Sequence, residues 1–188
     1  QTAAVVLAAD STRPDQVSAA FDHLDRSFGH LDVVLYNASQ RVRGPIAELD
    51  PAAVKEAVEV TAFGGFVVAQ QAARRMLARG SGTIMFTGAS ASVKGYAQSA
   101  AFAMGKFALR GLAQSLAREL HPQGIHIAHF VIDGGVRNAG RGRAEGVTDN
   151  PDSLLDPDAI AATYMHTLNQ PRSAWSWEIE VRPWVERF

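Results

Sequence analysis

Short apolar runs alternate along this chain with stretches whose apolar residues recur at helical spacing. Val17, Phe21, Leu24 and Phe28 lie three or four residues apart, which is typical of an amphipathic helix. The apolar runs are short and rich in alanine and β-branched residues, as in the buried strands of parallel sheets. Such runs span residues 3–9, 31–36, 83–87 and 125–131, and residues 177–181 fit an edge strand.

Capping residues mark the starts of the predicted helices. Asp50 and Asp156 each precede a proline, and aspartate at the N-cap before proline is a strong helix start. Thr12 and Ser99 are candidate N-caps of two further helices. Besides the helix after Thr12, helices are predicted over about residues 51–78, 99–120 and 157–170. This alternation of strands and helices predicts an α/β fold with a doubly wound parallel sheet.

Composition narrows the class of protein. The chain has 188 residues, of which 47% are hydrophobic and 20% charged, as expected for one soluble domain with a sizeable core. A formal net charge of −1 gives no bulk attraction to nucleic acid or to an anionic membrane. The absence of cysteine excludes disulfides and thiolate catalysis. Because no apolar run reaches the ~18 residues of a membrane span, we expect a cytoplasmic protein.

The histidines do not indicate a metal site. His121, His126 and His129 show no spacing with carboxylates that is typical of a metal site, so we expect no bound metal.

Residues 137–156 are polar and rich in glycine and arginine, which predicts a loop.

The segment from residue 82 to residue 120 is the most informative. It predicts a buried strand, a loop of small residues and a helix with one lysine, Lys106, among alanines, glycines and phenylalanines. A cation there is costly unless it faces a ligand or a partner. The position one turn earlier shares its helix face, and a proton-donating partner would lie there. That position holds Phe102, so the segment has the arrangement of an active site without its acid.

These features resemble the short-chain dehydrogenase/reductase family, and the resemblance covers nearly the whole chain. The family carries Tyr-x-x-x-Lys on such a helix, with a serine at the end of the preceding strand. Further motifs follow in the family's order: Ala9-Asp10, LDVVLYNAS at 31–39, VTAFGGF at 60–66 and GIHIAHFVIDGGV at 124–136. The resemblance implies a Rossmann-type fold. It also implies an oxidoreductase that uses NAD or NADP and acts on a carbonyl or alcohol.

The family's catalytic residues are mostly substituted. Thr61 stands at the asparagine position and Ala89 at the serine position. Phe102 replaces the tyrosine, and Lys106 alone is retained. Phenyl and methyl groups have no proton to give and cannot hydrogen-bond a carbonyl oxygen. In the family the lysine holds the ribose hydroxyls and lowers the pKa of the tyrosine, and only the first role can survive here.

Two side chains in the loop after strand 83–87 are candidates for the missing group. Ser90 directly follows Ala89, and Tyr96 lies ten residues before Lys106. A loop tyrosine can reach into a cleft that a helix tyrosine has vacated, although it is more often simply exposed. We therefore expect Ser90, Tyr96 or a water molecule to handle the proton while Lys106 orients the ribose.

The resemblance also implies cofactor contacts at three turns. Asp10 matches the residue that contacts the adenine. The turn at Asn37, Ala38 and Ser39 matches the one behind the adenine ribose. The turn at Gly134, Gly135 and Val136 matches the one that covers the nicotinamide. Ser39 stands where the family has glycine, and Asp133 where it has proline. An acidic side chain beside a nicotinamide would change the local field. We expect the loop at 137–156 to be the substrate loop.

The family's glycine-rich dinucleotide turn is absent from the sequence, which starts at Gln1. We therefore expect a single incomplete domain over residues 1–188, lacking the first two strands and helices. In the family's strand order, 3-2-1-4-5-6-7, those strands lie between 3–9 and 31–36. A gap or a non-native pairing is expected there, together with low stability.

Two functions remain open at this stage. One is a short-chain oxidoreductase with altered catalytic residues. The alternative is a catalytically silent member that binds a nucleotide or a protein partner. Small residues such as Gly64, Gly65 and Gly105 mark the helices 51–78 and 99–120, which form the family's subunit interface. We expect a homodimer or homotetramer with a small-molecule substrate, and neither nucleic acid nor membrane as a partner.

Overall fold

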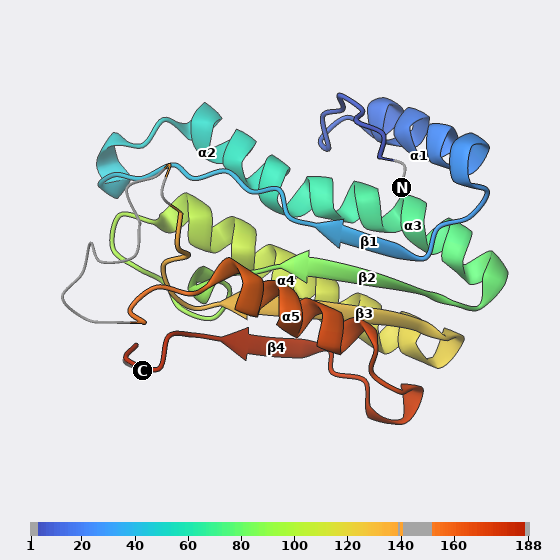
Figure 1. Ribbon diagram of the computed structural model, residues 1–188. Coiled ribbons are helices and arrows are strands. Elements are labelled where there is room, and N and C mark those ends of the chain that lie inside the picture. Colours follow the sequence, from blue (N-terminus) through green and yellow to red (C-terminus); the bar gives the residue numbers. More distant parts are fainter. Residues whose placement is uncertain (1–3, 139, 141–151, 187–188) are drawn as a thin grey trace.

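A computed structural model describes residues 4–138, 140 and 152–186 (Figure 1). Strands and helices alternate along the chain, as the apolar pattern predicts. The elements are α1 (Pro14–Phe28), β1 (Val33–Tyr36), α2 (Pro51–Val58), α3 (Gly64–Arg79), β2 (Gly82–Thr87), α4 (Ala100–Leu120), β3 (Ile125–Ile132), α5 (Pro157–Leu168) and β4 (Glu178–Val181).

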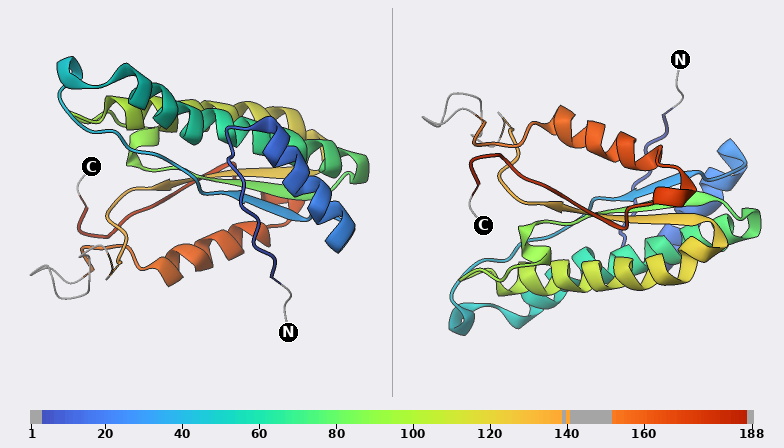
Figure 2. Two further views of the ribbon diagram at one scale, coloured as in Figure 1. Left: turned by 90° about the horizontal axis from the view of Figure 1, so that it is seen from above. Right: turned by 90° about the horizontal axis from the view of Figure 1, so that it is seen from below.

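The strands of the described residues form one parallel sheet in the order β1-β2-β3-β4. Helices α2, α3 and α4 cover one face of the sheet and α5 covers the other, while α1 packs against α3 (Figure 2). The predicted α/β fold with helices on both faces of a parallel sheet is confirmed. The carboxyl ends of β1, β2 and β3 lie at the same edge, where such sheets place their ligands.

The main core lies between the sheet and helices α3 and α4. Ile84 and Phe86 of β2 and Ile127 of β3 face Met76 and Leu109 there, and all five side chains are fully buried. On the opposite face, a smaller cluster joins β2 and β3 to α5. Apolar residues on both faces explain why the central strands appear in the sequence as nearly continuous apolar runs.

Two of the four predicted helix caps form and two do not. The Asp50 carboxylate accepts hydrogen bonds from the first turn of α2, and Asp156 does the same for α5. Ser99 occupies the N-cap position of α4, but its side chain makes no capping bond. The prediction for Thr12 is wrong because its N–H and hydroxyl both donate to Asp10, and Arg13 is the N-cap of α1.

The predicted helix over residues 51–78 contains a π-helical segment, Glu59–Phe63, between α2 and α3. Thr61 lies at its centre with no exposed surface. Gly105 of α4 faces it so closely that a Cβ there would lie 2.8 Å from the Thr61 Cβ. The glycine therefore permits a close approach within this chain, at the place where α4 carries Lys106.

The expected strand at residues 3–9 does not form over residues 4–9, the part of it that the structure describes. Residues 4–9 are irregular and exposed, because a strand needs a neighbour for its N–H and C=O groups and the described residues supply none beside it. The expectation that strand 31–36 is buried on both faces is also wrong. Val33 and Leu35 of β1 are 40% and 51% exposed, since α5 lies over the strands farther from this edge.

The segment 137–156 lies largely outside the described residues, but its two ends are described. Val136 pairs with Leu155 as an isolated parallel bridge, and the Arg137 N–H donates to the Leu155 carbonyl at 2.9 Å. An ion pair of 2.8 Å joins Arg137 to Asp156. The segment therefore starts and ends beside the turn at Gly134–Val136. Within the described residues, no helix has the length and apolarity to cross a membrane.

Candidate functional site

Lys106 lies in α4 beneath the carboxyl end of β2. Its side chain is 2% exposed, and its Nζ donates to the Thr87 carbonyl oxygen at 2.6 Å. Burial, and then the positive charge of Arg41, lower the pKa of Lys106 to about 8. An ammonium has three N–H donors, so a single carbonyl partner leaves capacity for a ligand.

The Phe102 ring lies next to this ammonium. Its centroid is 5.9 Å from Lys106 Nζ, which confirms that the two side chains share one face of α4. The Phe102 ring is 7% exposed, and the guanidinium carbon of Arg41 lies over it, 4.0 Å from the centroid. Arg41 belongs to the loop after β1. A cation therefore covers the ring that stands at the family's tyrosine position.

The π-helical segment forms the neighbouring wall. The Thr61 hydroxyl oxygen accepts a hydrogen bond from the Gln40 N–H at 3.2 Å. This hydrogen bond joins the π-helical segment to the loop that carries Arg41. π-helical segments are frequent at functional sites.

The remaining predicted catalytic residues lie in the loop between β2 and α4. Ala89 is buried, and Ser90 is half-buried at the start of a short 3₁₀ turn, Ser90–Ser92. Tyr96 is 48% exposed farther along the loop. The structure places Ser90 beside the strand end that meets Lys106, whereas no described contact joins Tyr96 to Lys106.

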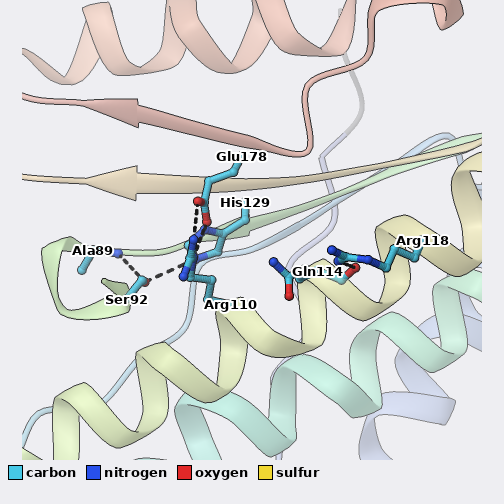
Figure 3. A network of polar contacts seen from close by, with 7 residues as sticks. All are labelled: Ala89, Ser92, Arg110, Gln114, Arg118, His129 and Glu178. Carbon is cyan, nitrogen blue, oxygen red and sulfur yellow. Dashed lines mark hydrogen bonds and ion pairs between the residues drawn. The ribbon is translucent and has the colours of Figure 1, made fainter. Parts of the chain in front are cut away.

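A buried polar network supports this loop (Figure 3). The Ser92 hydroxyl oxygen accepts from the Ala89 N–H at 3.1 Å and lies 3.3 Å from His129 Nε2. His129 Nδ1 lies 3.1 Å from Glu178 Oε2, and Arg110 holds the same carboxylate through two bonds of 2.6 and 2.8 Å. Since a carboxylate only accepts, Nδ1 carries the proton of a neutral ring and Nε2 accepts from the Ser92 hydroxyl.

Burial holds the histidine of this network in its neutral form. It lowers the pKa of His129 to about 4, against the opposing effect of the Glu178 carboxylate. Burial alone would raise the pKa of Glu178, but Arg110 and then His129 outweigh it and lower that pKa. Ser92 and His129 have no exposed surface, so this Ser-His-Glu arrangement supports the fold rather than attacking a substrate.

Sequence reasoning missed both Arg41 and this network. A histidine within a run of apolar strand residues was the available signal for His129. Its partner Glu178 lies on a separate strand, and only the β3–β4 register brings the two together. No cluster in the described part of the chain has the acidic, histidine or cysteine ligands for a metal.

The predicted adenine-side residues lie at the carboxyl end of β1 and before α1. Asn37, Ala38 and Ser39 directly follow β1 and are exposed, so their backbone groups are open to a ligand. Asp10 is exposed too, but hydrogen bonds from the N–H and then the hydroxyl of Thr12 lower its pKa. The Asp10 carboxylate therefore stabilises the turn that leads from Asp10 to Thr12.

At the turn predicted to cover the nicotinamide, two cations lie beside the carboxylate of Asp133. Lys94 Nζ lies 2.8 Å and an Arg182 nitrogen 3.0 Å from the Asp133 carboxylate, which is 3% exposed. The Asp133 N–H donates to the Val181 carbonyl of β4, a bond that a proline could not make. The expected effect of an acidic side chain on the local field is therefore offset, and Gly134 follows directly.

These residues fit a nicotinamide nucleotide in part. Exposed backbone follows β1, and the spare Lys106 donors and the Gly134–Val136 turn suit ribose hydroxyls and a carboxamide. Two clefts of about 450 and 340 Å³ lie elsewhere. They adjoin Gly82, Gly124 and Trp175 near the amino ends of the strands. We place the site by its polar groups and strand ends rather than by cavity size.

Comparisons with known proteins agree with this geometry. The sequence profile of the family described as short chain dehydrogenase matches residues 1–146. The human 17-beta-hydroxysteroid dehydrogenase type 1 is 32% identical over 142 residues, which cover 76% of this chain and 40% of that protein.

Solved structures share the fold. A short-chain dehydrogenase from Rhodopseudomonas palustris is 38% identical with a TM-score of 0.79 over 96% of this chain and 74% of that one. An alcohol dehydrogenase from Thermococcus sibiricus, complexed with 5-hydroxy-NADP, is 22% identical with a TM-score of 0.81, covering 95% and 74%. The chain spans about half the length of the curated relatives it matches. Its matched residues and its sheet nevertheless show that it belongs to the short-chain dehydrogenase family.

Proposed function

We propose that the protein is an oxidoreductase that uses NAD or NADP and acts on a carbonyl or alcohol with an altered catalytic set. The observation that carries this proposal is the buried Lys106 ammonium at the carboxyl end of β2, with donors to spare. A buried ammonium is costly, and ribose hydroxyls would offset that cost. Structures of this fold have been solved with NADP and with NAD+.

The chain's own residues would divide the work in the following way. The cofactor, when bound, supplies or accepts the hydride. Lys106 would hold its ribose, and the exposed turn Asn37, Ala38 and Ser39 would lie behind the adenine ribose. Gly134, Gly135 and Val136 would cover the nicotinamide through their backbone. Segment 137–156 would supply substrate contacts.

The proton of the substrate oxygen needs a donor other than Phe102. Ser90 would hydrogen-bond this oxygen from the β2–α4 loop, with a water molecule or Tyr96 as the proton source. The half-buried position of Ser90 at the strand end favours it over the exposed Tyr96 as the group in contact with substrate.

Lys106→Ala should weaken NADH and NADPH binding by about 10-fold or more, the worth of a charge-assisted hydrogen bond. Ligand-detected NMR and calorimetry would measure the affinity. Lys55→Ala is the matched control, since it removes the same charge from an exposed side chain of α2 and should leave binding unchanged. Equal affinity of the Lys106→Ala variant and the unmodified chain would contradict the ribose role.

The second candidate is a catalytically silent member that binds nucleotide without hydride transfer. Thr61, Ala89 and Phe102 favour it, because they replace three of the family's four catalytic residues. Oxidation of NADH or NADPH in the presence of a panel of aldehydes and ketones separates the two functions. Binding without turnover of any substrate would support the silent member.

We also propose that the protein is a homodimer or homotetramer through helices α2 to α4. Phe63, Phe66, Met104 and Phe107 on this layer are between 44% and 55% exposed. Large exposed apolar side chains on neighbouring helices mark an interaction surface.

Phe107→Asp should shift the protein toward the monomer, because a carboxylate in an apolar contact loses its hydration. Sedimentation velocity would measure the change as a lower sedimentation coefficient. Trp184→Asp is the control, since Trp184 is 77% exposed but lies in the C-terminal tail. A Phe107→Asp variant with the unmodified oligomeric state would overturn this interface.

A further inference from the structure

We propose that Lys106 is also a nucleophilic amine, which binds small aldehydes covalently as an imine. This activity goes beyond the hydride transfer proposed above and needs no cofactor. The chain contains three lysines, Lys55, Lys94 and Lys106, and the structure describes all of them. Their surroundings differ in the features that decide whether a lysine carries a charge or a lone pair.

The other two lysines each lie beside a carboxylate. Lys55 is exposed on α2, where water solvates its ammonium, and its Nζ lies 3.6 Å from a Glu59 oxygen. Lys94 Nζ lies 2.8 Å from the Asp133 carboxylate, and this hydrogen bond raises the pKa of Lys94. An ammonium has no lone pair and cannot attack a carbonyl carbon. These two side chains are therefore poorly suited to imine formation near neutral pH.

Lys106 has the surroundings of a neutral amine. It is 2% exposed, and its Nζ donates to the Thr87 carbonyl oxygen, which carries no net charge. The Phe102 ring lies on the same helix face, with its centroid 5.9 Å from Nζ. Burial, and then the positive charge of Arg41, lower the pKa of Lys106 to about 8. Desolvation and a neighbouring cation are the two conditions that activate lysine as a nucleophile in proteins.

The nearby carboxylate of Glu178 is committed to other groups. Arg110, one turn after Lys106 in α4, holds it at 2.6 Å, and His129 Nδ1 lies 3.1 Å from it. His129 is neutral, and the positive charge of Lys106 contributes to its lowered pKa. The charge of Glu178 is thus balanced by Arg110 and does not draw a proton onto Lys106.

The hydrogen bond to Thr87 leaves the lone pair of a neutral amine available. A neutral amine has two N–H groups and one lone pair. One N–H continues to donate to the Thr87 carbonyl, which lies 2.6 Å from Nζ and holds the nitrogen at the carboxyl end of β2. Loss of the third proton therefore leaves this bond intact and directs the lone pair away from the strand.

Imine formation consumes one aldehyde and releases one water. The lone pair of Lys106 forms a C–N bond to the carbonyl carbon, and the carbonyl oxygen takes a proton from the nitrogen. The C–O bond of this carbinolamine then breaks, and the hydroxyl leaves as water with a proton from solvent. The product is a protonated imine, nothing is oxidised or reduced, and hydrolysis reverses the reaction. Because Lys106 is 2% exposed, the class is limited to small aldehydes.

Reductive trapping with propanal tests this activity on the unmodified chain. Cyanoborohydride reduces the imine to a stable secondary amine, and peptide mass spectrometry shows which lysine carries the propyl group. At pH 8 we expect Lys106 to be labelled at least about 10-fold faster than Lys55, since an ordinary lysine is less than about 1% neutral there. The rate at Lys106 should level off above about pH 8. Equal rates at the two lysines, or no label on Lys106, would overturn the proposal.

Phe102→Glu and Phe102→Gln separate the charge beside the lysine from the shape of the side chain. A glutamate one turn before Lys106 would pair with it and raise its pKa. We therefore expect Lys106 to be labelled about 5-fold or more slowly in Phe102→Glu than in Phe102→Gln at pH 8, with equal labelling of Lys55. Both variants keep the lysine, and thermal melting shows whether each is folded. Equal rates at Lys106 in the two folded variants would overturn its activation by an uncharged, apolar neighbourhood.

NADH distinguishes this activity from the proposed function. If the ribose binds Lys106, a saturating concentration of NADH should slow the labelling of Lys106 and leave that of Lys55 unchanged. Bound NADH without protection of Lys106 would contradict the ribose role and leave the imine standing. An unreactive Lys106, together with weaker NADH binding by Lys106→Ala, would overturn the imine and leave the ribose role.

Discussion

The double variant Phe102→Tyr, Ala89→Ser should reduce carbonyl substrates at least about 100-fold faster than the unmodified protein, since general acid catalysis contributes roughly 10²–10⁴-fold. Both changes return groups that hydrogen-bond a carbonyl oxygen. They do so beside Lys106, whose Nζ lies 5.9 Å from the Phe102 centroid. That ammonium would lower the pKa of the new phenol, as nearby positive charge does.

Both changes add one oxygen atom to a largely buried side chain. The Phe102 ring is 7% exposed under Arg41, so a hydroxyl at its edge stays within reach of solvent and of the guanidinium. Ala89 is also 7% exposed and begins the turn that Ser92 supports, so the added hydroxyl of Ala89→Ser would lie in a buried position beside this turn.

Rates of NADH and NADPH oxidation would be compared for the double variant, each single variant and Phe102→Leu. The leucine variant changes the ring without adding a proton donor and should stay at the unmodified rate. A flat rate in the double variant, with cofactor still bound, would show that the site has diverged beyond simple repair or uses another acid such as Tyr96.

The sequence predicted the fold because local and periodic signals carry it. Apolar runs mark β2 and β3, whose strands are buried on both faces, and Asp50 and Asp156 mark helix starts that form as expected. The failures occur where a tertiary neighbour decides the outcome. Residues 4–9 have the composition of a strand but no adjacent strand, and β1 has an apolar sequence but an exposed face.

The site was predictable only as far as helix spacing reaches. The spacing of four positions, about one helix turn, was enough to predict from the sequence that Phe102 lies beside Lys106. Arg41 and Glu178 lie far from these positions in sequence, and the fold brings them into place through a loop and through the β3–β4 register. No sequence motif marks either residue. A guanidinium that stacks on a ring and a carboxylate that pairs with a strand histidine can come from any distance along the chain.

The buried network predicts a loss of stability in mild acid. An unfolded histidine takes up a proton below about pH 6.5. In the folded protein, burial lowers the pKa of His129 to about 4. Between these pH values the unfolded state binds more protons, so the free energy of unfolding falls as the pH falls from 6.5 to 4. The full effect of His129 is on the order of 3 kcal/mol.

His129→Asn isolates this contribution, since asparagine keeps an N–H toward Glu178 and does not titrate. Urea unfolding at several pH values between 7 and 4 would measure it. We expect the variant to lose less stability in acid than the unmodified protein, while His166→Asn, a change at an exposed position of α5, keeps the unmodified slope. Glu178 also loses stabilising interactions in acid, because its pKa is lowered, so part of the slope should remain. Identical slopes for His129→Asn and the unmodified protein would show that the pKa of His129 is the same in the folded and unfolded states. The histidine would then become protonated within the fold, where Nε2 would donate and the Ser92 hydroxyl could no longer donate to it.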